Sequence, residues 1–181
     1  MTDAVDRKFE RLRRDGPEGN GYAMVPRDGM CLSAFLLVHP HGAPTQFLLG
    51  RVDPAQPWDH IGGLTRERLR DIGTRWMLPS SHLLEYEEPA AAAHRIAAEQ
   101  LERPDLTLAG PEVRSEAYRR EGRDDPDLHW DLHFLFRGEW PEGKLVRARP
   151  WSELRFFDMG HLPPEGVARG GRDILELAGY H

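Results

Sequence analysis

Hydrophobic residues fall into short blocks separated by Gly- and Pro-rich segments, a pattern that predicts several short strands and helices. Residues 30–39 and 45–52 are almost continuously apolar, which is typical of strands covered on both faces. The segment PHGAP between them is rich in turn residues, so we expect these two strands to form a hairpin. Residues 111–121 and 144–149 predict two further strands.

Residues 128–138 alternate between hydrophobic and polar side chains, which predicts a half-buried strand. The hydrophobic positions are Trp130, Leu132, Phe134 and Phe136, and the polar positions are His129, Asp131 and His133. Because alternate residues share one face of a strand, the three polar residues are a candidate metal group. A polar sheet face, or a wall that faces a ligand, is the preferred interpretation.

Four segments have the spacing and the end signals of helices. The strongest, residues 89–102, is rich in Ala, Leu, Glu and Gln; Pro89 suits its first turn and Pro104 ends it. Residues 65–72 and 172–180 predict two shorter helices, of which the second closes the chain. Residues 3–14 predict an amphipathic helix that packs on the domain or on a second copy, so a homodimer is one expectation.

The composition favours a single loop-rich α/β domain. The chain has 181 residues, and Gly and Pro contribute 18 and 15 of them. We expect an N-terminal helix and loop over residues 1–29 and one domain over residues 30–181.

The net charge of -6 argues against nucleic acid as a partner. Cys31 is the only cysteine, and the sequence shows no signal peptide or membrane span, so we expect a cytoplasmic protein without membrane contact.

Residues 76–103 carry the pattern that bears on function. The sequence WMLPSSH precedes Glu87, and Arg95, Glu99 and Gln100 follow within the helix predicted over residues 89–102. This arrangement resembles the Nudix box, in which Gly, five residues, Glu and seven residues precede Arg-Glu-apolar-x-Glu-Glu-x-Gly-apolar. The resemblance extends to FLLGR before the box and to LHWDLHFLF and SELRFFDMGHLP after it. Together these segments span roughly residues 30–163 in matching order.

The resemblance implies a Nudix-type α/β/α sandwich with a mixed β-sheet. It also implies a pyrophosphohydrolase that acts on nucleoside diphosphate derivatives with Mg²⁺ or Mn²⁺. By position in the motif, Glu99 and Glu87 are the candidate catalytic residues, and both are candidate metal ligands together with Glu102 and Glu85. Arg51, Arg95, His82 and Asp131 are the candidate binding residues for a nucleotide-type ligand. A structural alternative for Glu87 is to brace the loop through Arg95.

The sequence departs from the family at the positions that matter most for the metal. Ile96 stands where the family has a Glu, and Gln100 stands in place of the second Glu of the pair. Ser81 and Glu102 occupy the two Gly positions. An apolar side chain cannot bind Mg²⁺, and an amide binds it more weakly than a carboxylate, so we expect impaired metal binding.

Two functions therefore remain open. The first is a divergent hydrolase that uses Mg²⁺ or Mn²⁺ held by Glu99, Glu87 and either Glu85 or Glu102. The second is a catalytically silent module that needs no cofactor and binds a nucleotide-type ligand or a protein.

Overall fold

The computed structural model describes residues 30–53, 72, 75–84, 86–119, 128–145, 148, 151–164, 166–168 and 170–181. The chain divides into two compact units. Unit 1 contains residues 1–32 and 115–133, and unit 2 contains residues 33–114 and 134–181. The helix predicted over residues 3–14, and with it the basis for a homodimer, lies outside the described residues, as does most of the helix predicted over residues 65–72.

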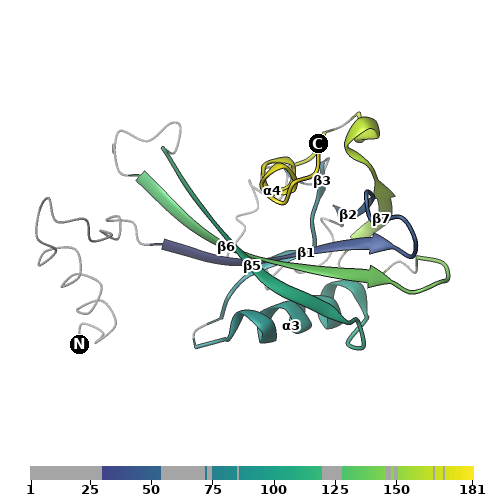
Figure 1. Cartoon of the computed structure of the whole chain (residues 1–181), viewed down its shortest axis with the longest axis horizontal. Coiled ribbons are helices and arrows are strands. Elements are labelled where there is room, and N and C mark those ends of the chain that lie inside the picture. The colour runs from purple at the N-terminus through teal and green to yellow at the C-terminus, as the bar shows by residue number, and fades with distance from the viewer. Residues whose placement is uncertain are drawn as a thin grey trace, which may run out of the picture. The chain divides into compact units, whose positions relative to one another are not determined.

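The larger sheet has the strand order β4-β1-β6-β5. Its strands are β1 (Met30–Pro40), β4 (Ser80–His82), β5 (Leu108–Arg119) and β6 (Leu128–Trp140). β1 pairs antiparallel with β4, with Ser33 opposite His82. Within unit 2, β1 and β6 run in the same direction (Figure 1), so the sheet is mixed. The strands predicted over residues 111–121 and 128–138 are confirmed as β5 and β6.

A second, antiparallel sheet has the order β3-β2-β7. It contains β2 (Phe47–Val52), β3 (Trp76–Met77) and β7 (Trp151–Phe157). The predicted hairpin of β1 and β2 is therefore wrong, because the two strands lie in different sheets. Their continuous hydrophobicity correctly indicated burial on both faces, but burial does not determine which strand is the hydrogen-bonding partner. The strand predicted over residues 144–149 is also wrong at its described residues Lys144, Leu145 and Ala148.

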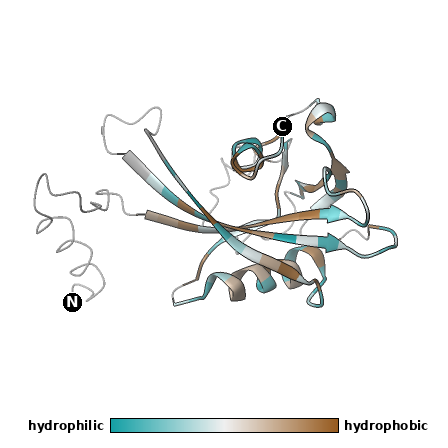
Figure 2. Cartoon of the chain, in the orientation of Figure 1, coloured by the Kyte–Doolittle hydropathy of each residue, from teal (hydrophilic) through white to brown (hydrophobic). Residues whose placement is uncertain are grey.

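Two helices cover opposite faces of the larger sheet in unit 2, as Figure 1 shows. They are α3 (Pro89–Leu101) and α4 (Arg172–Leu177). Leu36 of β1 packs in the core on the α3 side, whereas its neighbour Leu37 packs in the core on the α4 side. Hydrophobic residues make up most of β1 and much of α3 (Figure 2). The predicted α/β/α sandwich with a mixed sheet is confirmed.

The sequence signals at the ends of α3 agree with its structure. Pro89 lies in its first turn, and the helix ends one residue before the predicted boundary. Glu102 then adopts a left-handed conformation with φ 53°, and the Arg103 N–H donates to the Ala97 carbonyl at 2.9 Å. This is the geometry of a helix end that usually has glycine, the residue that the Nudix pattern places here. The backbone adopts this conformation with Glu at the position.

Trp151 of β7 connects the smaller sheet to α3. Its indole N–H donates to the Gln100 carbonyl at 2.7 Å, and the side chain is fully buried. The ring lies directly over Gly50 of β2, where an added Cβ would be 2.3 Å from the nearest ring atom. Glycine at position 50 is therefore required for this packing.

Among the described helices, none is long and apolar enough to cross a membrane.

Candidate functional site

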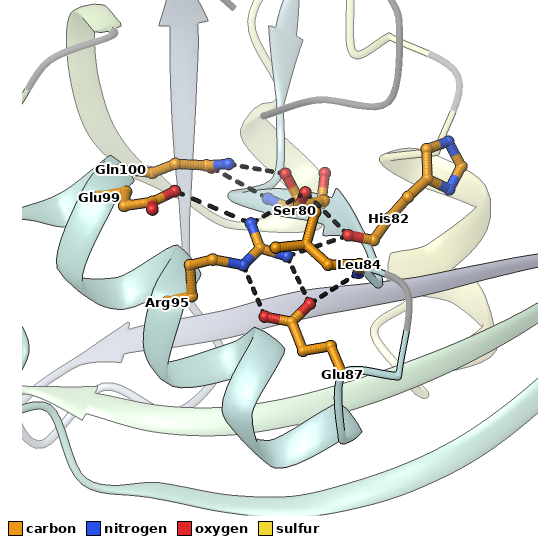
Figure 3. A network of polar contacts seen from close by, with 8 residues as sticks. Ser80, His82, Leu84, Glu87, Arg95, Glu99 and Gln100 are labelled. Carbon is orange, nitrogen blue, oxygen red and sulfur yellow. Dashed lines mark hydrogen bonds and ion pairs between the residues drawn. The ribbon is translucent and has the colours of Figure 1, made fainter. Parts of the chain in front are cut away.

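Arg95 organises the segment that resembles the Nudix box (Figure 3). It projects from α3, and its Nε and Nη2 donate to the two Glu87 carboxylate oxygens at 2.7 and 2.8 Å. The same guanidinium donates to the His82 carbonyl at 3.1 Å and to the Ser81 hydroxyl at 3.3 Å. One side chain thus ties the loop after β4 to the helix. Such a two-pronged pair of charged groups is among the stronger hydrogen-bonded arrangements in proteins.

Glu87 is fixed by this pair and by the backbone of its own loop. Its Oε2 accepts the Leu84 N–H at 2.8 Å, and its side chain is only 12% exposed. The hydrogen bonds from Arg95 lower the pKa of Glu87; burial opposes the shift, and the Leu84 N–H supports it. In turn, the bond to Glu87 raises the pKa of Arg95. Glu87 therefore has the geometry of a structural brace, the alternative expected from the sequence.

Glu99, the retained acid that lies on the helix itself, is more accessible than Glu87. The Glu99 carboxylate lies 3.8 Å from Arg95 Nη1, one turn along α3, and its side chain is 38% exposed. Glu102 is exposed, but it belongs to the left-handed residue that ends the helix. Glu85 lies outside the described residues. Of the four candidate metal ligands, Glu99 alone is both described and presented from the regular part of the helix.

Ile96 has become part of the hydrophobic core. Its side chain is completely buried in the cluster beneath the larger sheet, with Leu36 and Phe136 among the other members. A Glu at this position would place a carboxylate in that core, at a large desolvation cost. Ile96 stands where the Nudix pattern has Glu, and its apolar surroundings suit the Ile side chain.

Gln100 uses both ends of its amide to hold β4. The Ser80 N–H donates to Gln100 Oε1 at 3.2 Å, and Gln100 Nε2 donates to the Ser80 carbonyl at 2.8 Å (Figure 3). The residue is 3% exposed. A carboxylate could accept the first bond but could not donate the second. Gln100 thus closes a two-way link between helix and strand, and its oxygen is directed at the Ser80 backbone.

The remaining predicted binding residues lie on strands. His82 is half-buried, and its Nδ1 is 3.0 Å from the Ser33 hydroxyl across the β1–β4 pair. The Arg51 guanidinium of β2 lies over the Trp76 ring, 5.4 Å from its centroid. Asp131 is buried on β6 in unit 1, as is His133, which lies 3.8 Å from Glu116. Burial of Asp131 and His133 contradicts a simple division of β6 into a buried apolar face and an exposed polar one.

The residues of the box do not fit a catalytic Mg²⁺ or Mn²⁺ site. Such ions take several oxygen ligands, preferably carboxylates. Here Glu87 is committed to Arg95, Ile96 is in the core and Gln100 is bonded to Ser80. In the described part of the chain, no three His, Cys, Asp or Glu side chains are grouped to hold a metal ion. The arrangement instead provides a hydrogen-bonded loop–helix junction, with Glu99 accessible on the helix.

A cavity on the α4 side of unit 2 was not expected from the sequence. It has a volume of about 530 Å³, and Arg137, Asp158, Met159 and Tyr180 are among the residues that line it. Arg137 donates to the Ala178 carbonyl at 2.6 Å and to the Tyr180 hydroxyl at 3.2 Å. No short motif joins these residues. They come from β6, from the segment after β7 and from the end of the chain, so only the folded structure reveals the group.

The mixed sheet and the two helices that cover it match the fold of the Nudix hydrolases. Solved structures of that class are similar to the chain over most of its length. The Escherichia coli dihydroneopterin triphosphate pyrophosphohydrolase is 14% identical, with a TM-score of 0.56, and the match covers 81% of this chain and 92% of that one. The MutT protein from Methanosarcina mazei Go1 is also 14% identical, with a TM-score of 0.54 and coverages of 86% and 95%.

A third similar structure is the Nudix domain of Shewanella oneidensis NrtR complexed with ADP-ribose. It is 14% identical, with a TM-score of 0.50, and the match covers 98% of this chain and 97% of that one. No protein-family model matches the sequence, and neither does any curated protein. At these identities the likeness establishes the Nudix fold and leaves the activity to be argued from the site.

Proposed function

We propose that the protein is a Nudix-fold binding module for a nucleotide-type ligand, and that its box region supports the fold instead of holding a catalytic dication. The observation that carries the proposal is the use of the box side chains. Ile96 packs in the core, and the Gln100 amide is bonded in both directions to Ser80. Two positions where the family has metal-binding acids thus contribute to folding.

The ligand class is supported by the fold and by the cavity. A Nudix domain of similar structure has been solved in complex with ADP-ribose. In this chain the cavity of about 530 Å³ falls within the usual range for small-ligand sites. Arg137 brings a half-exposed guanidinium suited to phosphate, with the Glu112 carboxylate 3.5 Å from it. Tyr180 brings an aromatic ring, and Asp158, which is paired with His161 at 2.9 Å, brings an acceptor for sugar hydroxyls. This set can bind a nucleoside diphosphate derivative without a metal ion.

Calorimetric titration with ADP-ribose tests the proposal. The native protein should bind ADP-ribose equally well in EDTA and in Mg²⁺, and chromatography should show no AMP formed. Arg137→Gln should weaken binding at least tenfold. The matched control is Arg172→Gln, which removes the same charge from an exposed residue of α4 that does not line the cavity. Absence of binding to the native protein, or dependence of binding on Mg²⁺, would refute the proposal.

The exposed carboxylate of Glu99 favours a second candidate function, a divergent pyrophosphohydrolase. Its test is the release of phosphate or nucleoside monophosphate from a panel of nucleoside diphosphate derivatives with Mg²⁺ or Mn²⁺. Turnover by the native protein that is lost in Glu99→Gln would support this candidate and contradict a silent module. Equal background rates in both proteins would remove it.

A further inference from the structure

The loop that connects β1 to β2 contacts the end of β6. β1 and β6 are neighbours in the larger sheet and run in the same direction within unit 2, so the loop starts where β6 ends (Figure 1). His41 lies in this loop, and its Nδ1 is 2.7 Å from Glu139 Oε1 of β6. Its Nε2 lies 3.9 Å from the Glu142 carboxylate. His41 therefore joins the loop to β6 through an imidazole that faces two carboxylates.

The titratable groups around His41 come from three elements. Glu139 lies on β6, Glu142 lies in the segment after it, and His39 lies on β1, with its Nδ1 3.9 Å from Glu139 Oε2. The His41 side chain is 58% exposed, whereas that of His39 is 21% exposed. Two histidines thus share the Glu139 carboxylate, and the more exposed His41 makes the shorter contact.

The contact with Glu139 favours the charged form of His41. The hydrogen bond to Glu139 raises the pKa of His41 from its ordinary value of 6.5, and the charges of Glu139 and Glu142 add to the effect. The same hydrogen bond lowers the pKa of Glu139. The charged pair is therefore complete below pH 6.5 and is lost as the pH rises through the raised pKa of His41.

The same loop forms part of the wall of the cavity. Pro44 and Thr45 line the cavity together with Arg137, which lies two residues before Glu139 on β6. The His41–Glu139 pair thus joins the loop to the strand that carries the proposed phosphate-binding cation. The wall of the cavity and its main charged group are therefore connected through one exposed pair.

Two successive turns give the loop its shape. The Ala43 N–H donates to the Pro40 carbonyl at 3.1 Å, and the Gln46 N–H donates to the Ala43 carbonyl at 3.1 Å. Gly42 is the third residue of the first turn, and its φ of 71° suits glycine. These hydrogen bonds lie within the loop, so they set its conformation. The His41–Glu139 contact sets its position against β6.

We propose that the His41–Glu139 pair makes ligand binding in the cavity depend on pH. Charged His41 holds the loop, and with it Pro44 and Thr45, in the position at which the cavity has room for a ligand. A wall that is fixed before binding loses less conformational entropy when the ligand enters. Neutral His41 holds the loop less firmly, so affinity falls as the pH rises. The inference rests on the proposed function, because it assigns a regulation to the same cavity.

Titration of the full-length protein with ADP-ribose from about pH 5.5 to about pH 8.5 tests the inference. The pyrophosphate keeps its charge over this range, so changes in affinity come from the protein. At the acid end, His41→Gln should bind about two- to fivefold more weakly than the native protein, and at the alkaline end the two should bind alike. Glu139→Gln should behave as His41→Gln does. The ratio of native to variant affinity separates His41 from His161 and His181.

His94→Gln provides a matched control. It removes an exposed histidine of α3 that does not line the cavity, so its affinity should follow that of the native protein at every pH. Nuclear magnetic resonance should show the His41 ring titrating above pH 6.5 in the native protein and closer to 6.5 in Glu139→Gln.

The inference is overturned if ADP-ribose binds but the affinity ratio of the native protein to His41→Gln is the same at both ends of the pH range. That result would leave the proposed function standing. A His41 ring that titrates at or below pH 6.5 would overturn the inference as well. Absence of ADP-ribose binding at every pH would refute the proposed function and this inference together.

Discussion

At the scale of single residues, the side chains of the segment that resembles the Nudix box are engaged in hydrogen bonds. Gln100 differs from glutamate only by an amide nitrogen in place of an oxygen, and that nitrogen donates to the Ser80 carbonyl at 2.8 Å. Glu87 accepts three hydrogen bonds, two from Arg95 and one from the Leu84 N–H. Both side chains now hold the loop and β4 against α3. Gln100 and Glu87 therefore contribute to the stability of the folded protein.

The Glu87–Arg95 pair should make stability depend on pH. Glu87→Gln should lower the free energy of unfolding at neutral pH by about 2–3 kcal/mol, because it weakens charged hydrogen bonds and leaves Arg95 without its main partner. The pKa of Glu87 is lowered in the folded protein from 4.5. Its contribution is therefore complete above the unfolded-state pKa and is lost as the pH falls through the lower folded-state pKa. The difference in free energy of unfolding between the native protein and Glu87→Gln should therefore disappear as the pH falls below the folded-state pKa of Glu87.

Urea unfolding across this pH range measures the effect. The control is Glu88→Gln, which removes an exposed carboxylate one residue away and should have little effect at any pH. If the difference in free energy of unfolding between the native protein and Glu87→Gln stays constant into the acid range, the ion pair with Arg95 is not the cause of that difference.

At the scale of elements, the sequence predicted local features well and partners less well. The composition of α3, with Pro89 and Pro104 at its ends, located the helix to within one residue. Alternation along residues 128–138 located β6. The pairing of β1 with β2 was predicted wrongly, because hydrophobic runs report burial and not hydrogen-bonding partners.

The departures of the box from the family pattern were visible in the sequence, but their structural roles were not. Ile96 and Gln100 stood out by residue type alone. The partners that explain them are distant in the chain: Ser80 is 20 residues from Gln100, and Trp151 is 51 residues from it. The cavity around Arg137 likewise depends on segments that only the folded chain brings together. Periodicity carries no information about such long-range contacts.

The junction of β2, β7 and α3 should be sensitive to volume at position 50. Gly50→Ala should lower the free energy of unfolding by about 1–3 kcal/mol, because its Cβ would overlap the Trp151 ring. Chemical denaturation measures this. In a Trp151→Leu background the same change should have a smaller effect, since the ring is gone. An equal effect in both backgrounds would show that the ring is not the obstacle.

At the scale of the whole molecule, the Nudix fold is combined with a helix that has Ile96 and Gln100 where the Nudix pattern has Glu. The sandwich and the mixed sheet are those of the Nudix fold. The residues that would complete a dication site are instead part of the core and of the link to β4. The protein thus has the Nudix fold, and in its box segment Glu87 and Gln100 support structure.

Titration of the full-length protein with Mn²⁺, followed by the electron paramagnetic resonance signal of the free ion, tests this account most directly. We predict no saturable binding of Mn²⁺ at millimolar concentrations, and the same result for Glu99→Gln. Gln100→Glu should not create a site either, because the new carboxylate faces the Ser80 carbonyl and should instead lower stability. Stoichiometric Mn²⁺ binding by the native protein that is abolished in Glu99→Gln would contradict the account.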